Sequence, residues 1–173
     1  YLNFEDSKSV RTHTDNIVNS EVFKNKVKNV LGSQNWQIFS IQIWRNYPED
    51  FKNRDKEVNS SFYHVDNGGD KEHRLIVNIF MYLSPISETN GPFTFYDKNT
   101  SQKIHKRFYK SIVKYGNLRK YFLAKKIEAY KKPNVLLDTK GEALIINNQE
   151  CLHRAGFCSN QHRDIIEIIV QPK

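Results

Sequence analysis

The sequence lacks several features that would mark a membrane, disulfide-stabilised or multidomain protein. It has two cysteines and one methionine among 173 residues, and no uninterrupted apolar run approaches the ~18 residues of a membrane span. Two cysteines do not supply the framework of a small secreted fold, so we expect free thiols and a reducing, cytoplasmic compartment. The length suits one domain over residues 1–173, with no linker. Because the first residue is Tyr1 rather than Met, a preceding segment is left open.

Acidic residues are scarce in one segment, residues 102–132, where eleven lysines and arginines face only Glu128. The segment carries a net charge of +10, which leaves −2 for the rest of a chain of net charge +8. Its aromatic residues recur at roughly helical spacing, so we expect a helical insertion of one or two amphipathic helices, bordering the substrate entrance. A surface that attracts an anionic substrate or partner is the alternative, and the pattern does not favour nucleic-acid binding.

The rest of the chain predicts one helix followed by short strands. Apolar residues repeat at helical intervals from Asp15 to Leu31, and Gly32 is placed to end that helix. Turn residues then separate eight β-rich runs, which favours an antiparallel sandwich or barrel with helices packed outside it. The eight runs are Trp36–Trp44, Ser61–Asp66, Leu75–Leu83, Phe93–Tyr96, Asn134–Asp138, Glu142–Asn147, Glu150–Arg154 and Arg163–Gln171.

A metal site is indicated by the tripeptide His64-Val65-Asp66 at the end of a strand-like run. Residues two apart in a strand point to the same face, so this imidazole and this carboxylate can converge on one ion. A facial triad of two histidines and one carboxylate needs a second imidazole, for which His153 is the candidate. If His153 and Arg163 flank a hairpin, the guanidinium lies on the strand next to the metal.

Other interpretations of the same residues stay open. Cys151, His153, Cys158 and His162 could form a structural zinc site, although their spacing matches no known finger or ribbon pattern. Both cysteines could equally be core or loop residues. Arg163 could form a surface salt bridge with Asp164 or Glu167 instead of binding a ligand.

At these residues the sequence resembles the double-stranded β-helix oxygenases that depend on Fe(II) and 2-oxoglutarate, and in particular the phytanoyl-CoA dioxygenase-like family. The resemblance runs over roughly residues 36 to 172 and is carried by Phe62-Tyr63-His64-Val65-Asp66, Met81-Tyr82-Leu83, Asn90-Gly91-Pro92-Phe93, His153-Arg154-Ala155-Gly156 and Arg163. It implies a mainly β, cupin-like jelly roll with flanking helices. Two departures are Asp97-Lys98-Asn99-Thr100, where relatives often carry Gly-Ser-His, and Ala155, where some carry a small hydroxyl residue.

The resemblance also implies roles for single residues. His64, Asp66 and His153 would bind iron and form the catalytic centre, and Arg163 would pair with the far carboxylate of 2-oxoglutarate. A guanidinium can hold a buried carboxylate through two hydrogen bonds, whereas lysine offers a point charge. Asn78 matches a position that contacts the cosubstrate in relatives, and Gln42 matches a polar position on the first strand.

The expected reaction is hydroxylation of a small-molecule substrate, with release of succinate and CO₂, and an anionic substrate is one alternative. Related halogenases carry a small residue in place of the carboxylate, so Asp66 favours hydroxylation. Nucleobase-repair relatives carry a second arginine six residues after the first, where this chain has Ile169. The alternative is a non-catalytic β-barrel module that binds an anionic partner through residues 102–132.

Overall fold

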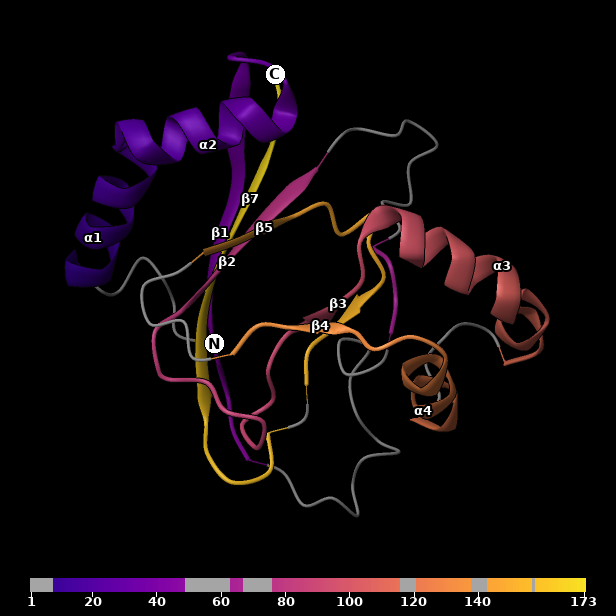
Figure 1. The fold of residues 1–173 in the computed structure, drawn as a ribbon. Helices are drawn as coiled ribbons and strands as arrows, with labels where there is room; N and C mark the ends of the chain where they lie inside the picture. Colours follow the sequence, from indigo (N-terminus) through magenta and orange to yellow (C-terminus); the bar gives the residue numbers. More distant parts are fainter. Residues whose placement is uncertain (1–7, 49–62, 67–75, 116–120, 138–142, 157) are drawn as a thin grey trace.

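A computed structural model describes residues 8–48, 63–66, 76–115, 121–137, 143–156 and 158–173 (Figure 1). Within these ranges no helix has the length and apolar character needed to cross a membrane. The elements run in the order α1 (Lys8–Asn19), α2 (Glu21–Leu31), β1 (Trp36–Asn46), β2 (Val77–Tyr82), β3 (Thr94–Phe95), α3 (Lys98–Tyr115), α4 (Tyr121–Tyr130), β4 (Asn134–Val135), β5 (Ala143–Ile146), β6 (His153–Arg154) and β7 (Arg163–Pro172).

The larger sheet has the strand order β1-β7-β2-β5, and every described pairing in it is antiparallel. Its two faces differ because successive side chains of a strand point to opposite sides. On β7, Ile166, Ile168 and Val170 pack into a core cluster beneath α2, while Arg163 and Glu167 line a cavity on the other face. Because side chains alternate, one face of the sheet packs into the hydrophobic core and the other face lines the cavity of a candidate site.

The smaller sheet has the order β4-β3-β6 and is also antiparallel. His64 extends it through an isolated antiparallel bridge to His153. The two sheets pack against each other through a core cluster in which Phe93, beside β3, meets Phe80 and Ile165 of the larger sheet. Two antiparallel sheets with a cavity between them agree with part of the predicted jelly roll.

The predicted N-terminal helix is two helices rather than one. Ser20 separates α1 from α2 and caps α2 in an extended conformation (φ −67°, ψ 142°), with its hydroxyl accepting a hydrogen bond from the backbone N–H of Phe23. Gly32 ends α2 in the left-handed region (φ 67°), as predicted. The apolar spacing continues through the cap, and for that reason periodicity alone missed the break.

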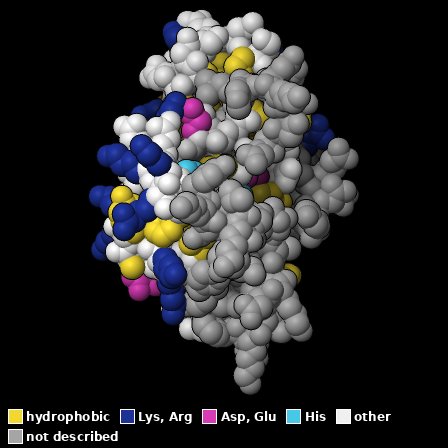
Figure 2. Space-filling view, turned by 90° about the vertical axis from the view of Figure 1, so that its right-hand side faces the viewer, with side chains coloured by type: hydrophobic (Ala, Val, Ile, Leu, Met, Phe, Trp, Pro, Cys, Tyr) yellow, Lys and Arg dark blue, Asp and Glu magenta, His cyan; other side chains and the backbone are white. Residues whose placement is uncertain are grey.

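The basic segment forms α3 and α4, as predicted, and these helices cover the smaller sheet. Ile104 of α3 and Leu123 and Ile127 of α4 are fully buried against Tyr63 and Tyr96. The opposite sides of the helices carry the charge, and Figure 2 shows Lys and Arg side chains gathered on this side of the molecule. The exposed basic side chains that the structure describes here are Lys98, Lys103, Lys106, Arg107, Lys125, Lys126, Lys131 and Lys132.

The prediction of a mainly β protein is corrected to a mixed α and β fold, because the described helices hold more residues than the described strands. The runs predicted at Phe93–Tyr96, Asn134–Asp138 and Glu150–Arg154 contain strands of only two residues. The run Ser61–Asp66 supplies only the His64 bridge, and its first two residues lie outside the described ranges. The other four runs match β1, β2, β5 and β7 to within a few residues.

Candidate metal and cosubstrate site

A reciprocal backbone pair places two imidazoles side by side. The N–H of His64 donates to the carbonyl of His153 (2.9 Å), and the N–H of His153 donates to the carbonyl of His64 (2.9 Å). Residues paired directly across an antiparallel bridge point to the same face. The rings accordingly lie 4.4 Å apart between centroids. Residues 89 positions apart in the sequence thus share one site.

The side chain of Asp66 lies beside the two imidazoles because Asp66 is two residues beyond His64 and a hydrogen bond fixes its backbone. Its N–H donates to the carbonyl of Asn148 (2.9 Å). One carboxylate oxygen, Oδ1, lies 3.5 Å from Nε2 of His64 and 3.7 Å from Nε2 of His153. Among the described residues, these three side chains form the group with metal-ligand spacing, and their donor atoms all lie within 4.8 Å of one another.

His153 is held in an orientation suited to metal binding. Its Nδ1 lies 2.9 Å from the carbonyl oxygen of Cys151, which fixes the ring and leaves Nε2 facing Asp66. Burial, and then the neighbouring His64, lowers the pKa of His153 to about 4. The imidazole is therefore neutral at pH 7, the form that ligates a metal.

Asp66 is ionised at neutral pH although it is partly enclosed. Burial raises the pKa of Asp66, but the hydrogen bond from His64, the charges of His153 and His64 and a hydrogen bond from Asn148 outweigh burial and lower it. Two imidazoles and one carboxylate are a donor set that fits a divalent first-row metal such as Fe(II).

The alternative prediction of a zinc site is wrong, because the four described residues proposed for it do not come together around one ion. The thiol of Cys158 is buried and donates to the carbonyl of Asn90 (3.3 Å), and His162 pairs with Asp164 (3.6 Å). His153 turns Nδ1 to the backbone of Cys151 rather than toward its thiol. Neither Cys151 nor Cys158 is in a disulfide bond within the described residues, which agrees with the prediction of thiols.

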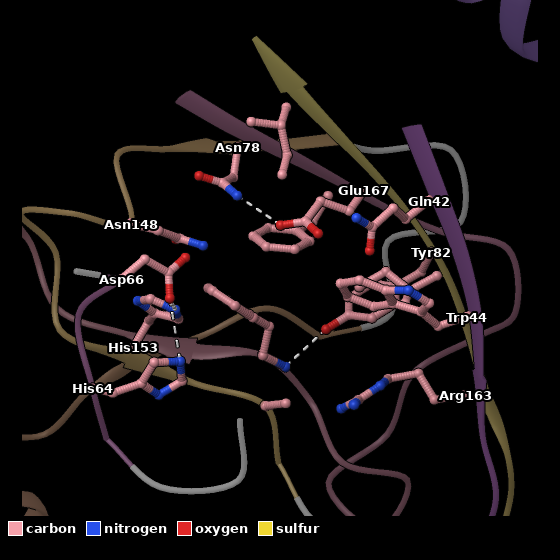
Figure 3. A pocket seen from close by; sticks show the side chains of 15 residues that line it. Gln42, Trp44, His64, Asp66, Asn78, Tyr82, Asn148, His153, Arg163 and Glu167 are labelled. Carbon is pink, nitrogen blue, oxygen red and sulfur yellow. Dashed lines mark hydrogen bonds and ion pairs between the residues drawn. The ribbon is translucent and has the colours of Figure 1, made fainter. Parts of the chain in front are cut away.

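A cavity of about 300 Å³ lies beside the three candidate ligands, between the two sheets (Figure 3). Its walls are largely apolar, with Trp44, Phe80, Phe93 and Ile165 among them. Polar side chains enter it from both sheets, and these include every candidate site residue that the sequence indicated: His64, Asp66, His153, Arg163, Asn78 and Gln42. The structure therefore brings all six to one place.

Arg163 reaches the cavity by a different route from the one predicted. His153 is in the smaller sheet and Arg163 is in the larger one, so the hairpin hypothesis is wrong. The guanidinium is buried and donates from Nη1 to the carbonyls of Gly91 and Gly156, and from Nε and Nη2 to Oδ1 of Asn46 (3.3 and 3.0 Å).

The alternative that Arg163 forms a surface salt bridge with Asp164 or Glu167 is also wrong, because both carboxylates have other partners among the described residues. Asp164 pairs with Arg45 on the neighbouring strand β1 (2.7 Å), and Glu167 accepts a hydrogen bond from Asn78. One N–H of Arg163, on Nη2, has no hydrogen-bond partner among the described residues.

Two polar residues of the cavity were missed by the sequence analysis. Glu167 was considered only as a surface partner of Arg163, yet it is buried in the cavity wall. A single charged residue inside the apolar strand Ile165–Ile169 was the available signal. Asn148 is buried in a turn between β5 and β6, and its Oδ1 has no hydrogen-bond partner within the described residues. No pattern in the sequence singled it out.

No family model matches the sequence, and no curated protein sequence matches it either. Solved structures do match by fold. A structure of HygX from Streptomyces hygroscopicus with iron bound aligns with a TM-score of 0.62 and 12% identity over 99% of this chain and 70% of that one. SnoK, a non-haem α-ketoglutarate-dependent carbocyclase from nogalamycin biosynthesis, aligns with a TM-score of 0.58 and 11% identity over 98% and 60%. A 2OG-Fe(II) oxygenase family protein from Burkholderia pseudomallei aligns with a TM-score of 0.52 and 12% identity over 94% and 56%.

These matches establish a fold shared with iron- and 2-oxoglutarate-dependent oxygenases. The chain spans less than two thirds of the length of several of them, including 34% of EvdMO1. At identities near 12%, the fold is what the likeness transfers, and the chemistry has to be argued from the residues of this chain.

Proposed function

We propose that the chain is an Fe(II)- and 2-oxoglutarate-dependent dioxygenase that hydroxylates a small molecule. In this proposal His64, Asp66 and His153 bind the iron, and Arg163 binds the far carboxylate of 2-oxoglutarate. The observation that carries it is the three donor atoms within 4.8 Å of one another at a cavity that also contains a buried guanidinium. The fold shared with oxygenases of this class supports the same chemistry.

Each residue has a distinct task in this mechanism. His64, Asp66 and His153 would hold the iron through two imidazole nitrogens and one carboxylate oxygen, a donor set that would leave room on the metal for cosubstrate and oxygen. Iron with 2-oxoglutarate and oxygen supplies the oxidising power when bound, with succinate and CO₂ as by-products. The neutral imidazole of His153 presents Nε2, while the carbonyl of Cys151 keeps its ring from turning. Trp44, Phe80 and Phe93 give the cavity an apolar wall, which would disfavour water beside the metal.

The substrate is proposed only by class. HygX has been solved with nickel, 2-oxoglutarate and hygromycin B, which shows a fold relative holding a small molecule together with the cosubstrate. A cavity of about 300 Å³ suits a cosubstrate and part of a small substrate. Asp66 occupies the carboxylate position, which favours hydroxylation over halogenation, and the phytanoyl-CoA dioxygenase-like assignment stays a prediction.

The test is anaerobic addition of Fe(II) and then 2-oxoglutarate to the purified protein. We expect a weak visible charge-transfer band that requires both additions, followed by formation of succinate when oxygen is admitted. A protein that binds neither iron nor 2-oxoglutarate would contradict the proposal.

A second candidate function is a non-catalytic module that binds an anionic partner through α3 and α4. It is favoured by the exposed lysines and arginines of these helices (Figure 2). The acidic residue among them, Glu128, is engaged by Arg154 (2.7 Å) and by the hydroxyl of Tyr63 (3.0 Å), so it does not offset the exposed positive charge. A purified protein that binds polyanions but does not bind a metal ion would favour this function.

A further inference from the structure

Glu167 is a carboxyl group on the wall of the proposed cosubstrate cavity. It is 6% exposed and lies on the same face of β7 as Arg163, four residues further along the strand. At about 3.3 Å per residue, the two backbone positions are roughly 13 Å apart. Figure 3 accordingly shows the Glu167 carboxyl beside Asn78 and Gln42, away from the guanidinium of Arg163.

Among the described residues, only one of the two carboxyl oxygens of Glu167 accepts a hydrogen bond. Oε1 accepts a short hydrogen bond from Nδ2 of Asn78 (2.6 Å). Within the described residues Oε2 has no partner, and no lysine or arginine pairs with the group. Arg163 is held by Asn46 and two backbone carbonyls, and Arg45 by Asp164. A buried carboxylate without a cation is costly, so the group needs either a proton or a positive partner.

Among the described residues that line the cavity, no charged side chain pairs with Glu167 as that positive partner. His64, Asp66 and His153 face the cavity from the smaller sheet and the segment that pairs with it, and Arg163 faces it from β7. On β1 and β2 the polar lining residues are uncharged at neutral pH: Gln42, Asn78 and Tyr82. The charge of Asp66 acts unfavourably on an ionised Glu167. An α-keto diacid would bring two further negative charges into the same space.

We propose that Glu167 is a cosubstrate-binding residue that works in its protonated form, held by Asn78 and donating a hydrogen bond from Oε2 to the α-keto acid. The inference rests on the proposed function and adds a consequence to it. When Glu167 is ionised, binding of 2-oxoglutarate takes up one proton from the solvent, which ends on Oε2. A carboxylic acid kept neutral by an apolar site is a known form of hydrogen-bond donor in proteins.

The state of the group without a ligand agrees with this role. Burial, against the hydrogen bond from Asn78, raises the pKa of Glu167 to about 7. Near neutral pH roughly half of the molecules would already carry the proton. Because 2-oxoglutarate binds the protonated molecules, its apparent affinity is proportional to the protonated fraction.

The experiment is calorimetric titration of 2-oxoglutarate into the Ni²⁺-loaded protein, in which turnover is blocked. The titration is done at pH 6.5 and pH 8, in two buffers with different ionisation enthalpies, for the wild type and for Glu167→Gln. The glutamine keeps a hydrogen-bond donor and removes the titration. Glu88→Gln is the matched control, because Glu88 is an exposed carboxyl outside this cavity.

For the wild type we expect the Kd to rise severalfold from pH 6.5 to pH 8, with protons taken up on binding of 2-oxoglutarate at pH 8. Glu88→Gln should behave in the same way. Glu167→Gln should bind with a Kd that changes less than twofold and should take up no proton. At pH 8 it should bind more tightly than the wild type.

A wild-type Kd that is independent of pH, without proton uptake, would overturn the inference while leaving the proposed function intact. Proton uptake that persists in Glu167→Gln would overturn it as well. Should this variant not fold, the proton uptake of the wild type in the two buffers decides alone. Absence of 2-oxoglutarate binding at either pH would contradict the proposed function itself, and the inference with it.

Discussion

His153 and Arg163 are ten residues apart in the chain and lie in different sheets, yet both side chains line one cavity. The connection between them crosses from the smaller sheet to the larger, and Gly156 lies in that crossing. The candidate metal ligands and the candidate cosubstrate residue are therefore positioned by separate hydrogen-bond networks. Metal binding and cosubstrate binding should respond to different substitutions.

Asp66→Ala should abolish metal binding without unfolding the protein. Its side chain is 46% exposed, so its removal leaves no large cavity in the core. Loss of groups that only orient a metal ligand already costs 10–100-fold in affinity, so loss of a ligand should cost more than about 100-fold. Calorimetric titration of Ni²⁺ measures this. His162→Ala is the control, since His162 belongs to the rejected zinc set, and equal losses in both variants would contradict the assignment.

Arg163→Lys should weaken 2-oxoglutarate binding and leave metal binding unchanged. Lysine cannot reproduce the planar group that donates to Asn46, Gly91 and Gly156 and has one further N–H without a partner in the described part of the chain. We expect the Kd for 2-oxoglutarate to rise about 10- to 100-fold, in line with the 1.5–3 kcal/mol typical of a hydrogen bond to a charged group. Titration of 2-oxoglutarate into the Ni²⁺-loaded variant measures it, and a parallel loss of Ni²⁺ affinity would show that the two networks are not separate.

Gly156→Ala should destabilise the fold near Arg163. An added Cβ at Gly156 would lie 2.6 Å from the carbonyl oxygen of Pro92 and 2.7 Å from the carbonyl carbon of Gly91, both backbone atoms. We expect the free energy of unfolding to fall by about 1–3 kcal/mol, the usual cost of overpacking, as measured by urea unfolding. Gly32→Ala is a contrasting control, because its Cβ would meet nothing within 4 Å and only the positive φ of 67° adds a cost. Equal stability of Gly156→Ala and the wild type would contradict this packing.

The sequence predicted which side chains lie together at one cavity better than it predicted the strands around them. His64 and Asp66 are two residues apart, and the geometry of extended chain alone puts them on one face. The long strand β7 was also predictable, because its apolar run is continuous. The lengths of the two-residue strands β3, β4 and β6 were overestimated, because their extent depends on pairing with segments that are distant in the sequence. The position of Arg163 could not be predicted from the sequence because it depends on how the two sheets pack. The burial of Glu167 could not be predicted because it depends on the cavity between the sheets.

The basic surface of α3 and α4 should affect anionic partners and not the metal site. Lys131→Gln/Lys132→Gln removes two exposed charges from this surface, and Lys26→Gln/Lys28→Gln removes two exposed charges from α2. If the surface binds polyanions, the first variant elutes from heparin at clearly lower salt than the second, because each lost phosphate- or sulfate-like contact reduces the salt dependence. Ni²⁺ affinity should match the wild type in both. Identical elution of the two variants would show that these lysines are only solvated.

Glu167 should make the stability of the metal-free protein depend on pH. Its pKa is raised to about 7 in the folded chain by burial, from 4.5 in an unfolded chain. Between these two values the folded state binds more protons than the unfolded state, so the free energy of unfolding decreases as the pH rises. The contribution is complete below pH 4.5 and is lost above about pH 7. A shift of this size corresponds to about 3 kcal/mol.

Comparison of the wild type with Glu167→Gln isolates this contribution, because all other titrating groups are shared. Urea unfolding at pH 5, 6 and 7.5 should show the variant gaining stability relative to the wild type as the pH rises, by roughly 2–3 kcal/mol in total. The gain arises because the amide cannot ionise in the apolar wall, whereas the carboxyl must do so beside the charge of Asp66. A constant difference across this range would mean that Glu167 is ionised in the folded protein at pH 5, with a cation beside it that the described residues do not provide.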